Sequence, residues 1–190
     1  SALQFDQARG RVWAGTMRWR WRERTGRLGW DLDWHGLLPG LKLSVTGAGL
    51  DLAGWLGGGP GRLRLVDWHL DLPVALIARF VERGDAGGRV TGRLQAFEWR
   101  DGTIAALDGR LRWSGGMVQW PPDGRAELPP LDGRLFMEDG SARGEITDPE
   151  GQRLASGRAA DGQLRLRVYR AWPMLLGVSR GGAASEVVFE

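Results

Sequence analysis

The chain has 190 residues, which is the length of one ordinary domain. Hydrophobic residues make up 42% and charged residues 26%, which excludes a disordered chain, and a net charge of only +3 does not indicate a nucleic-acid-binding protein. The lack of cysteine excludes disulfides, thiolate metal sites and cysteine nucleophiles. Glycine (31 residues) and tryptophan (11 residues) are abundant, so we expect many turns and a large apolar face.

Apolar and polar residues alternate with a period of two along most of the chain. Between Met17 and Arg22 the apolar side chains would lie on one face of a strand and the arginines on the other. One apolar and one polar face are typical of an antiparallel sheet with one solvated side. The sequence therefore predicts an all-β fold, either a long curved antiparallel meander or a partly open barrel. The expected strands include residues 17–22, 28–34, 41–45, 63–65, 68–72, 90–94, 107–113, 131–136, 164–168 and 187–189.

Turns and helices are predicted from glycine and proline. Asp-Gly pairs are typical of tight hairpin turns. The glycine-rich run 57–61 is expected to be a flexible connection between strands. Residues 73–83 have helical apolar spacing between Pro73 and Gly84, which predicts a short helix, and residues 172–177 are a second, weaker candidate. The Asp-Gly turns are expected at residues 101–102, 108–109, 123–124, 132–133, 139–140 and 161–162.

Candidate catalytic and metal-binding residues are few. His35 and His69 lie near several aspartates (Asp31, Asp33, Asp67 and Asp71), but without the short spacing of a metal site. Neither a Gly-x-Ser-x-Gly nucleophile motif nor a phosphate-binding loop is present in the sequence. We therefore predict a protein without catalytic residues, a metal site or a cofactor. A metal or acid–base pair at the histidines and nucleic-acid binding by Arg18–Arg22 remain as alternatives, as does glycan binding at the Trp120 loop.

The tryptophans raise a question about the apolar face. We expect Trp13, Trp19, Trp21, Trp30, Trp34 and Trp113 to lie on the inner face of the curved sheet. If these side chains fill that face, the domain suits an adaptor for other proteins. If they line an elongated cavity instead, the domain suits a groove-type binder or carrier of lipid or another amphiphile.

Several short motifs occur along the chain in a fixed order. Residues 148–157 resemble an Asp-x-x-Gly-x-Leu-x-x-Gly hairpin, with one extra residue between Gly151 and Leu154. The motif positions are Gly10, Val12, Trp13 and Gly15, then Trp30, then Gly109, Leu111 and Trp113, and finally Gly151, Gly157, Pro173 and Gly177. In this order and spacing they resemble the periplasmic domain of the type II secretion system protein N family.

The resemblance implies a role in the protein secretion machinery of Gram-negative bacteria. It implies a non-enzymatic accessory part of the inner-membrane assembly platform that associates with other platform subunits and, as a further partner, with the outer-membrane secretin. It also implies a single-pass inner-membrane protein whose periplasmic part is residues 1–190, one β-rich domain that begins after the membrane anchor. Carried over in this way, the matched residues are structural, and none is catalytic.

Overall fold

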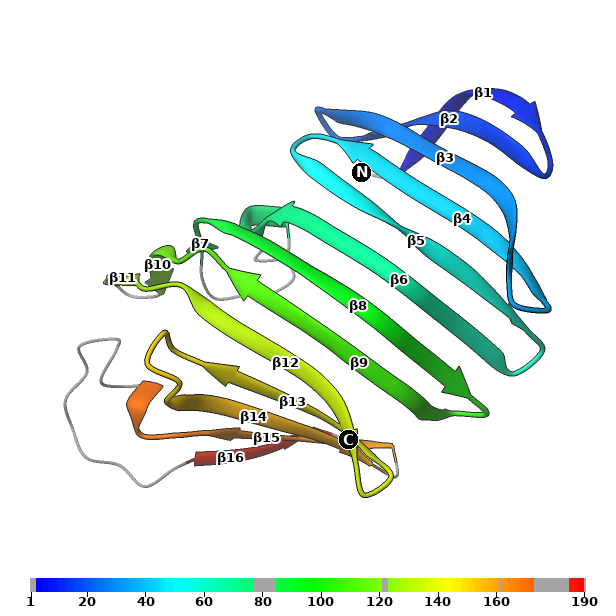
Figure 1. Cartoon of the computed structure of the whole chain (residues 1–190). Helices are drawn as coiled ribbons and strands as arrows, with labels where there is room; N and C mark the ends of the chain where they lie inside the picture. The colour runs from blue at the N-terminus through cyan, green and yellow to red at the C-terminus, as the bar shows by residue number, and fades with distance from the viewer. Residues whose placement is uncertain (1–2, 77–84, 121–122, 161, 173–184, 190) are drawn as a thin grey trace.

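The computed structural model describes residues 3–76, 85–120, 123–160, 162–172 and 185–189. Almost all of these residues form β-strands, and Figure 1 shows most of the strands side by side in one long, curved sheet. The order of the thirteen strands in this sheet follows the chain: β1-β2-β3-β4-β5-β6-β8-β9-β12-β13-β14-β15-β16. Each neighbouring pair is antiparallel, and β1 and β16 do not pair with each other, so the sheet is open. The predicted all-β meander is confirmed.

The strands are long in the first two thirds of the chain and shorter after it. A second, three-stranded sheet in the order β11-β10-β7 lies beside the main one. The elements are β1 (Gln4–Arg11), β2 (Ala14–Trp21), β3 (Arg24–His35), β4 (Leu38–Gly47), β5 (Leu50–Gly59), β6 (Arg62–Pro73), the 3-10 helix η1 (Val74–Leu76), β7 (Asp85–Ala86), β8 (Arg89–Arg100), β9 (Thr103–Trp113), β10 (Gly116–Trp120), β11 (Gly124–Leu128), β12 (Leu131–Glu138), β13 (Ser141–Thr147), β14 (Arg153–Ala160), β15 (Gln163–Val168) and β16 (Ser185–Phe189).

The strand register gives the main sheet one continuous apolar face. Residues that pair directly across neighbouring strands point to the same side of a sheet. A single row of such pairs crosses eleven strands without one charged residue. It runs through Met17, Leu28, Val45, Leu52, Leu70, Gly92, Leu111, Gly133, Ile146, Ala155 and Val168. We call this side the apolar face and the opposite side, which carries most of the strand arginines, the arginine face.

Tryptophan and glycine are partners across neighbouring strands. A side chain at Gly26 would collide with the ring of Trp19, and one at Gly54 would collide with the ring of Trp68. Both rings therefore lie flat over a strand that has no side chain at that point, as aromatic residues do when they cover strand glycines. Tryptophan and glycine are therefore abundant partly because they pack against each other across strands, and glycine does not serve only in turns.

The packed core is small for a chain of this length. Among the described residues, only the side chain of Leu154 is 0% exposed, and it contacts Leu131 and Ala171. Trp113 and Trp172 pack against this cluster from the side. The core therefore lies where the segment around Ala171 packs against the end of β9 and the starts of β12 and β14.

Some local predictions differ from the structure. The predicted helix 73–83 begins differently, because Pro73 ends β6 and Val74–Leu76 form a 3-10 turn, while residues 77–84 lie outside the described residues. Of the second predicted helix, only Trp172 is described, and it is helical, as is Ala171 before it. The run 57–61 is no flexible connection, since Gly57 to Gly59 belong to β5.

Two of the predicted Asp-Gly turns are also wrong. Asp101-Gly102 and Asp139-Gly140 do adopt positive φ in hairpins, as expected. The pairs at residues 108–109 and 132–133 instead continue β9 and β12. There the glycine makes room for a neighbouring leucine on the apolar face, namely Leu94 or Leu111.

Candidate functional site

The first family motif forms one cluster at the β1–β2 hairpin. Gly10 pairs with Gly15, and φ of +117° at Gly10 is a conformation that favours glycine. The ring of Trp30 lies over Gly15, and its Nε1 donates a hydrogen bond of 3.0 Å to the carbonyl of Val12. The structure thus brings Gly10, Val12, Gly15 and Trp30 together, although Trp30 is fifteen positions from Gly15 in the sequence.

The six tryptophans expected on the inner face do not share one environment. Trp19 is buried at 8% exposure, and Trp21, Trp30 and Trp113 are half-buried. Trp13, in the β1–β2 turn, is 54% exposed, and Trp34, near the end of the β3–β4 hairpin, is 60% exposed. These last two are therefore not core residues. Trp34 pairs with Pro39 beyond the point where β4 stops pairing with β5, so β5 does not reach it.

An apolar groove lies on the apolar face between β9 and β15. Its volume is about 450 Å³, and its exposed lining is almost entirely apolar. Glycines form part of its floor at Gly133, Gly144 and Gly157, where only leucine side chains approach. The walls include Leu107, Leu111, Leu135, Ile146, Leu164 and Leu166.

The remaining family motifs support the strands around this groove. In β9, Gly109 lies under Leu94, Leu111 lines the groove, and Nε1 of Trp113 donates a hydrogen bond of 2.9 Å to the carbonyl of Gly87. Asp148 is buried and its Oδ1 accepts a 2.7 Å hydrogen bond from the backbone N–H of Gln152.

The Asp148 turn also explains the positions of the motif glycines after it. Gly151 completes the turn with φ of +80°, and its N–H donates to the carbonyl of Asp148. Gly157, in β14, lies against Leu166. Pro173 and Gly177 lie outside the described residues.

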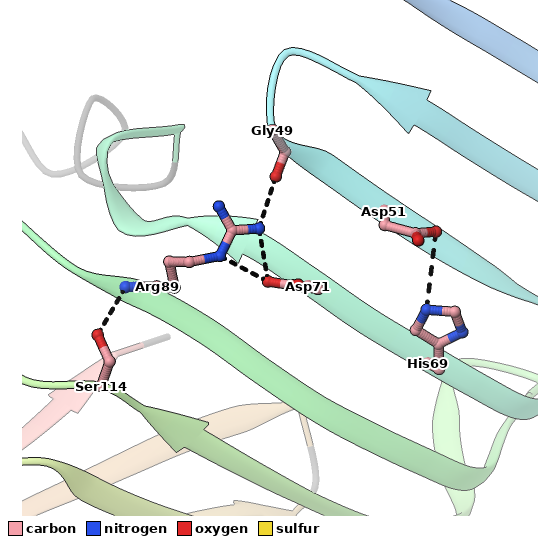
Figure 2. A network of polar contacts seen from close by, with 6 residues as sticks. All are labelled: Gly49, Asp51, His69, Asp71, Arg89 and Ser114. Carbon is pink, nitrogen blue, oxygen red and sulfur yellow. Dashed lines mark hydrogen bonds and ion pairs between the residues drawn. The ribbon is translucent and has the colours of Figure 1, made fainter.

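Polar residues of the arginine face form a network between β5 and β9, which Figure 2 shows. Both Nε and Nη2 of Arg89 donate to Oδ1 of Asp71, at 2.9 and 2.6 Å, and Nη2 also donates to the carbonyl of Gly49 at 2.8 Å. The backbone N–H of Arg89 donates to Oγ of Ser114. This network holds the β4–β5 turn to the start of β8.

The two histidines have different partners. Nε2 of His69 is 3.6 Å from Oδ1 of Asp51, with both side chains about half exposed (Figure 2). His35 packs against the ring of Trp55 at 5.4 Å. Within the described part of the chain, His and acidic residues do not form a group of three that would hold a metal ion.

One carboxylate on the arginine face is held between two guanidinium groups. Glu98 is buried, and Arg62 and Arg100 both reach its Oε1, the former with Nε at 3.1 Å. The hydrogen bond from Arg100 and, after it, that from Arg62 lower the pKa of the Glu98 carboxyl against the opposing effect of burial.

Trp55 is a residue that the sequence pattern did not single out. It is 6% exposed on the arginine face, where its ring fills the space above Gly40 and Gly57 and its Nε1 lies 3.4 Å from the carbonyl of Asp33. The signal for it in the sequence was the spacing Trp-x-Gly, in which the glycine two residues on lies on the same face of the strand.

These features define a class of protein by its architecture. The described residues form an open, single-layered β-sheet with one apolar face, and their polar clusters serve to hold strands together. None of the described helical segments combines the length and apolar character needed to cross a bilayer.

The chain belongs to the family of the type II secretion system protein N, whose family model matches residues 1–176. It is therefore a component of a protein secretion machinery, and such a component works with other subunits of that machinery. The comparison with curated proteins found no match, and neither did the comparison with solved structures.

Proposed function

We propose that the chain is a non-enzymatic adaptor in the periplasm, within the inner-membrane assembly platform of a type II secretion system. Residues 1–190 would act as one β-rich domain of an inner-membrane protein, and its partners would be other platform subunits and the secretin. Family membership supports the secretion role. The family-motif residues support a scaffold, since Gly10, Gly15 and Gly151 shape turns or close strand contacts and Trp30 and Trp113 hold strands together by hydrogen bonds.

The open edge at β1 is the observation that carries the adaptor proposal. All eight residues of β1 are exposed, and within the described residues the strand pairs only with β2. An unpaired edge presents backbone N–H and C=O groups to which a strand of another protein can add. The pairing shifts register between Asp6 and Arg9, where Gln7 has φ of 50°, and such a bulge limits indiscriminate edge pairing.

Site-specific photo-crosslinking in a bacterium with a working secretion system tests this role. A photoreactive residue in place of Phe5, which is 55% exposed in β1, should crosslink to the periplasmic part of a secretion subunit. The same residue in place of Met117, which is 44% exposed in β10, is the matched control and should not. A lack of crosslinks from Phe5 to any secretion subunit, or equal yields at both positions, would contradict edge docking.

The apolar groove favours a second candidate function, the binding of one acyl chain of a lipid or similar amphiphile. The groove has the size of a small-molecule site, which is roughly 300–1,000 Å³, and a nearly wholly apolar lining, as an alkyl chain requires. Native mass spectrometry of the chain purified from a periplasm would reveal bound lipid. Ala155→Phe, which places a ring in the groove, should then abolish that lipid, whereas an unchanged lipid mass would contradict binding at this groove.

A further inference from the structure

A row of arginines crosses the arginine face from β8 to β15. Arg93 of β8 lies directly opposite Arg110 of β9, which lies opposite Arg134 of β12. Farther along, Arg143 of β13 lies opposite Arg158 of β14, which lies opposite Arg165 of β15. The two rows join diagonally. Arg134 and Phe136 lie two residues apart on the same face of β12, and Phe136 lies opposite Arg143. We call these six residues the arginine track: one arginine on each of six successive strands.

The track is electrostatically unfavourable in the isolated chain. Like charges placed directly opposite each other in a sheet repel and destabilise it. Arg93, Arg110, Arg134, Arg158 and Arg165 are exposed, and in the described part of the chain none of them has a carboxylate within ion-pair distance. Two of them contact neutral groups: Arg134 lies over the ring of Phe136, and Arg158 donates to Oγ of Ser141. Arg143 alone takes an acid, Glu138 at 2.8 Å, with Asp139 at 4.0 Å.

A nearby arginine pair shows that the sheet can neutralise such a contact internally. Arg62 of β6 lies directly opposite Arg100 of β8, and Glu98 binds both guanidinium groups. In the track, Glu145 of β13 lies directly opposite Arg134, but it forms its ion pair with Arg153 at 2.8 Å and not with a track arginine. Within the described residues, the five arginines of the track other than Arg143 therefore have no ion pair, and their charge is available to a binding partner.

The end of the track is hollowed. A depression of about 400 Å³ between β13 and β15 is lined by Arg143, Arg153, Arg158, Arg165 and Arg167, with Glu145 as the sole acid among its described lining residues. Nη2 of Arg153 lies 2.8 Å from Oε1 of Glu145, so that acid already has a partner. Tyr169 also lines the depression, and its hydrogen bond with Ser156 and then the Arg153 guanidinium lower the pKa of its hydroxyl.

We propose that the arginine track is the docking site for an extended, acidic segment of a partner polypeptide. Guanidinium groups recognise carboxylates through paired hydrogen bonds, so charge complementarity selects an acidic chain. With strands about 4.8 Å apart, six successive arginines span about 24 Å, which is the length of about seven extended residues. This inference deepens the proposed adaptor function, on which it rests, by naming the chemistry of a partner.

A polypeptide fits the track better than an anionic membrane does. Proteins that bind a membrane surface usually place large apolar side chains beside their basic residues. The exposed large apolar side chains of β8 to β15 in the main sheet are Trp99, Ile146, Leu164 and Leu166, and their register places all four on the opposite, apolar face. The track itself adjoins polar side chains and the single ring of Phe136.

Fluorescence anisotropy with a labelled peptide of alternating glutamate and threonine tests the proposal on the full chain. The wild-type chain should bind this peptide, more weakly at high salt, and should not bind the same peptide with glutamine in place of glutamate. The track variant combines Arg110→Glu with Arg165→Glu, two exposed positions without an ion pair. We expect it to lower the affinity by about tenfold or more.

A control variant makes the same change in net charge elsewhere on the arginine face. It combines Arg18→Glu with Arg27→Glu, which are exposed and lie opposite each other on β2 and β3. This variant should bind the acidic peptide like the wild type, and circular dichroism should show that both variants are folded. Equal loss in both variants, or retained binding by the track variant, would overturn the proposal.

Two further measurements are needed. One asks whether a membrane or free phosphate binds the track instead of a polypeptide, and the other distinguishes failure of this site from failure of the proposed adaptor function. If phosphatidylglycerol vesicles or inorganic phosphate bind through the track more tightly than the peptide, a polypeptide partner is excluded. If crosslinking at Phe5 fails while peptide binding still depends on the track, the adaptor role fails and the acidic-segment site stands. If crosslinking succeeds and peptide binding ignores the track, only the site proposed here fails.

Discussion

The first and second halves of the main sheet cover their glycines in different ways. In β2 to β6, tryptophan rings lie over strand glycines, as Trp19 does over Gly26 and Trp55 over Gly57. In β9 to β15, the glycines face only leucine side chains, as Gly133 faces Leu111, and an apolar groove remains. The comparison teaches that the same glycine-rich strand pattern builds a packed surface or a hollow one, depending on whether the neighbouring strand supplies a large ring.

The largest effect is expected where a ring is removed from the packed half. Trp55→Ala should lower the free energy of unfolding by about 3–5 kcal/mol, because it leaves a cavity above two glycines. Leu166→Ala in the groove wall should cost only about 1 kcal/mol, since Leu166 is already 37% exposed. Urea denaturation measures both values. Similar losses in the two variants would mean that the halves do not differ in packing.

A smaller effect is expected from adding a single methyl group to a glycine. Gly26→Ala should destabilise the chain by about 1–3 kcal/mol, because the new Cβ would overlap the Trp19 ring and the carbonyl of Thr46. Gly133→Ala is the matched change in the groove, where the nearest atom, Cβ of Leu111, would be 3.4 Å away. It should be neutral or stabilise by up to about 1 kcal/mol, because it restricts the unfolded chain. Melting temperatures would compare them, and a destabilising Gly133→Ala would show that the groove floor is tightly packed.

The smallest effect on the free energy of unfolding is expected where the two halves of the sheet meet, at β6 and β8. The folded pKa of Glu98 is lowered by Arg100 and Arg62, so its stabilisation is present above the ordinary carboxyl pKa and is lost as the pH falls through the folded pKa. Glu98→Gln should therefore destabilise the chain by about 1–2 kcal/mol at neutral pH. The difference from wild type should shrink in acid, as urea denaturation across this pH range would show.

Glu150→Gln is the control for this titration. Glu150 is exposed in the Asp148 turn, and its replacement should leave the pH dependence of stability unchanged. A constant difference between Glu98→Gln and wild type at all pH values would contradict the role of the Glu98 charge.

The sequence predicted the fold better than it predicted the surroundings of individual residues. Period-two alternation located the strands because it reflects a sheet with one solvated side, and it predicted the arginine face from Arg18 and its neighbours. It did not predict that Trp34 is exposed, because exposure depends on how far a hairpin extends beyond its neighbours. It also placed a turn at Asp108-Gly109, since a glycine under a cross-strand leucine and a glycine in a turn look alike in a sequence.

The candidate sites were harder to predict than the strands. The family motifs identified Gly10, Gly15 and Trp30, yet their contact with one another depends on the register between β2 and β3. The arginine track was also hidden, because it joins residues as far apart as Arg93 and Arg165. A single unpaired arginine in a strand carries no signal, and only the alignment of six strands turns such residues into a surface.

The order of the strands determines how the sheet forms and which strands unfold first. Because nearly every strand pairs with the strands next to it in the chain, loop closure is short and the sheet can grow by adding one hairpin at a time. In such quasi-one-dimensional arrays, stability is approximately a sum over neighbours, and the terminal units fray first. Amide hydrogen exchange should thus be fastest in β1, the strand with every residue exposed, and slowest in the middle of the sheet.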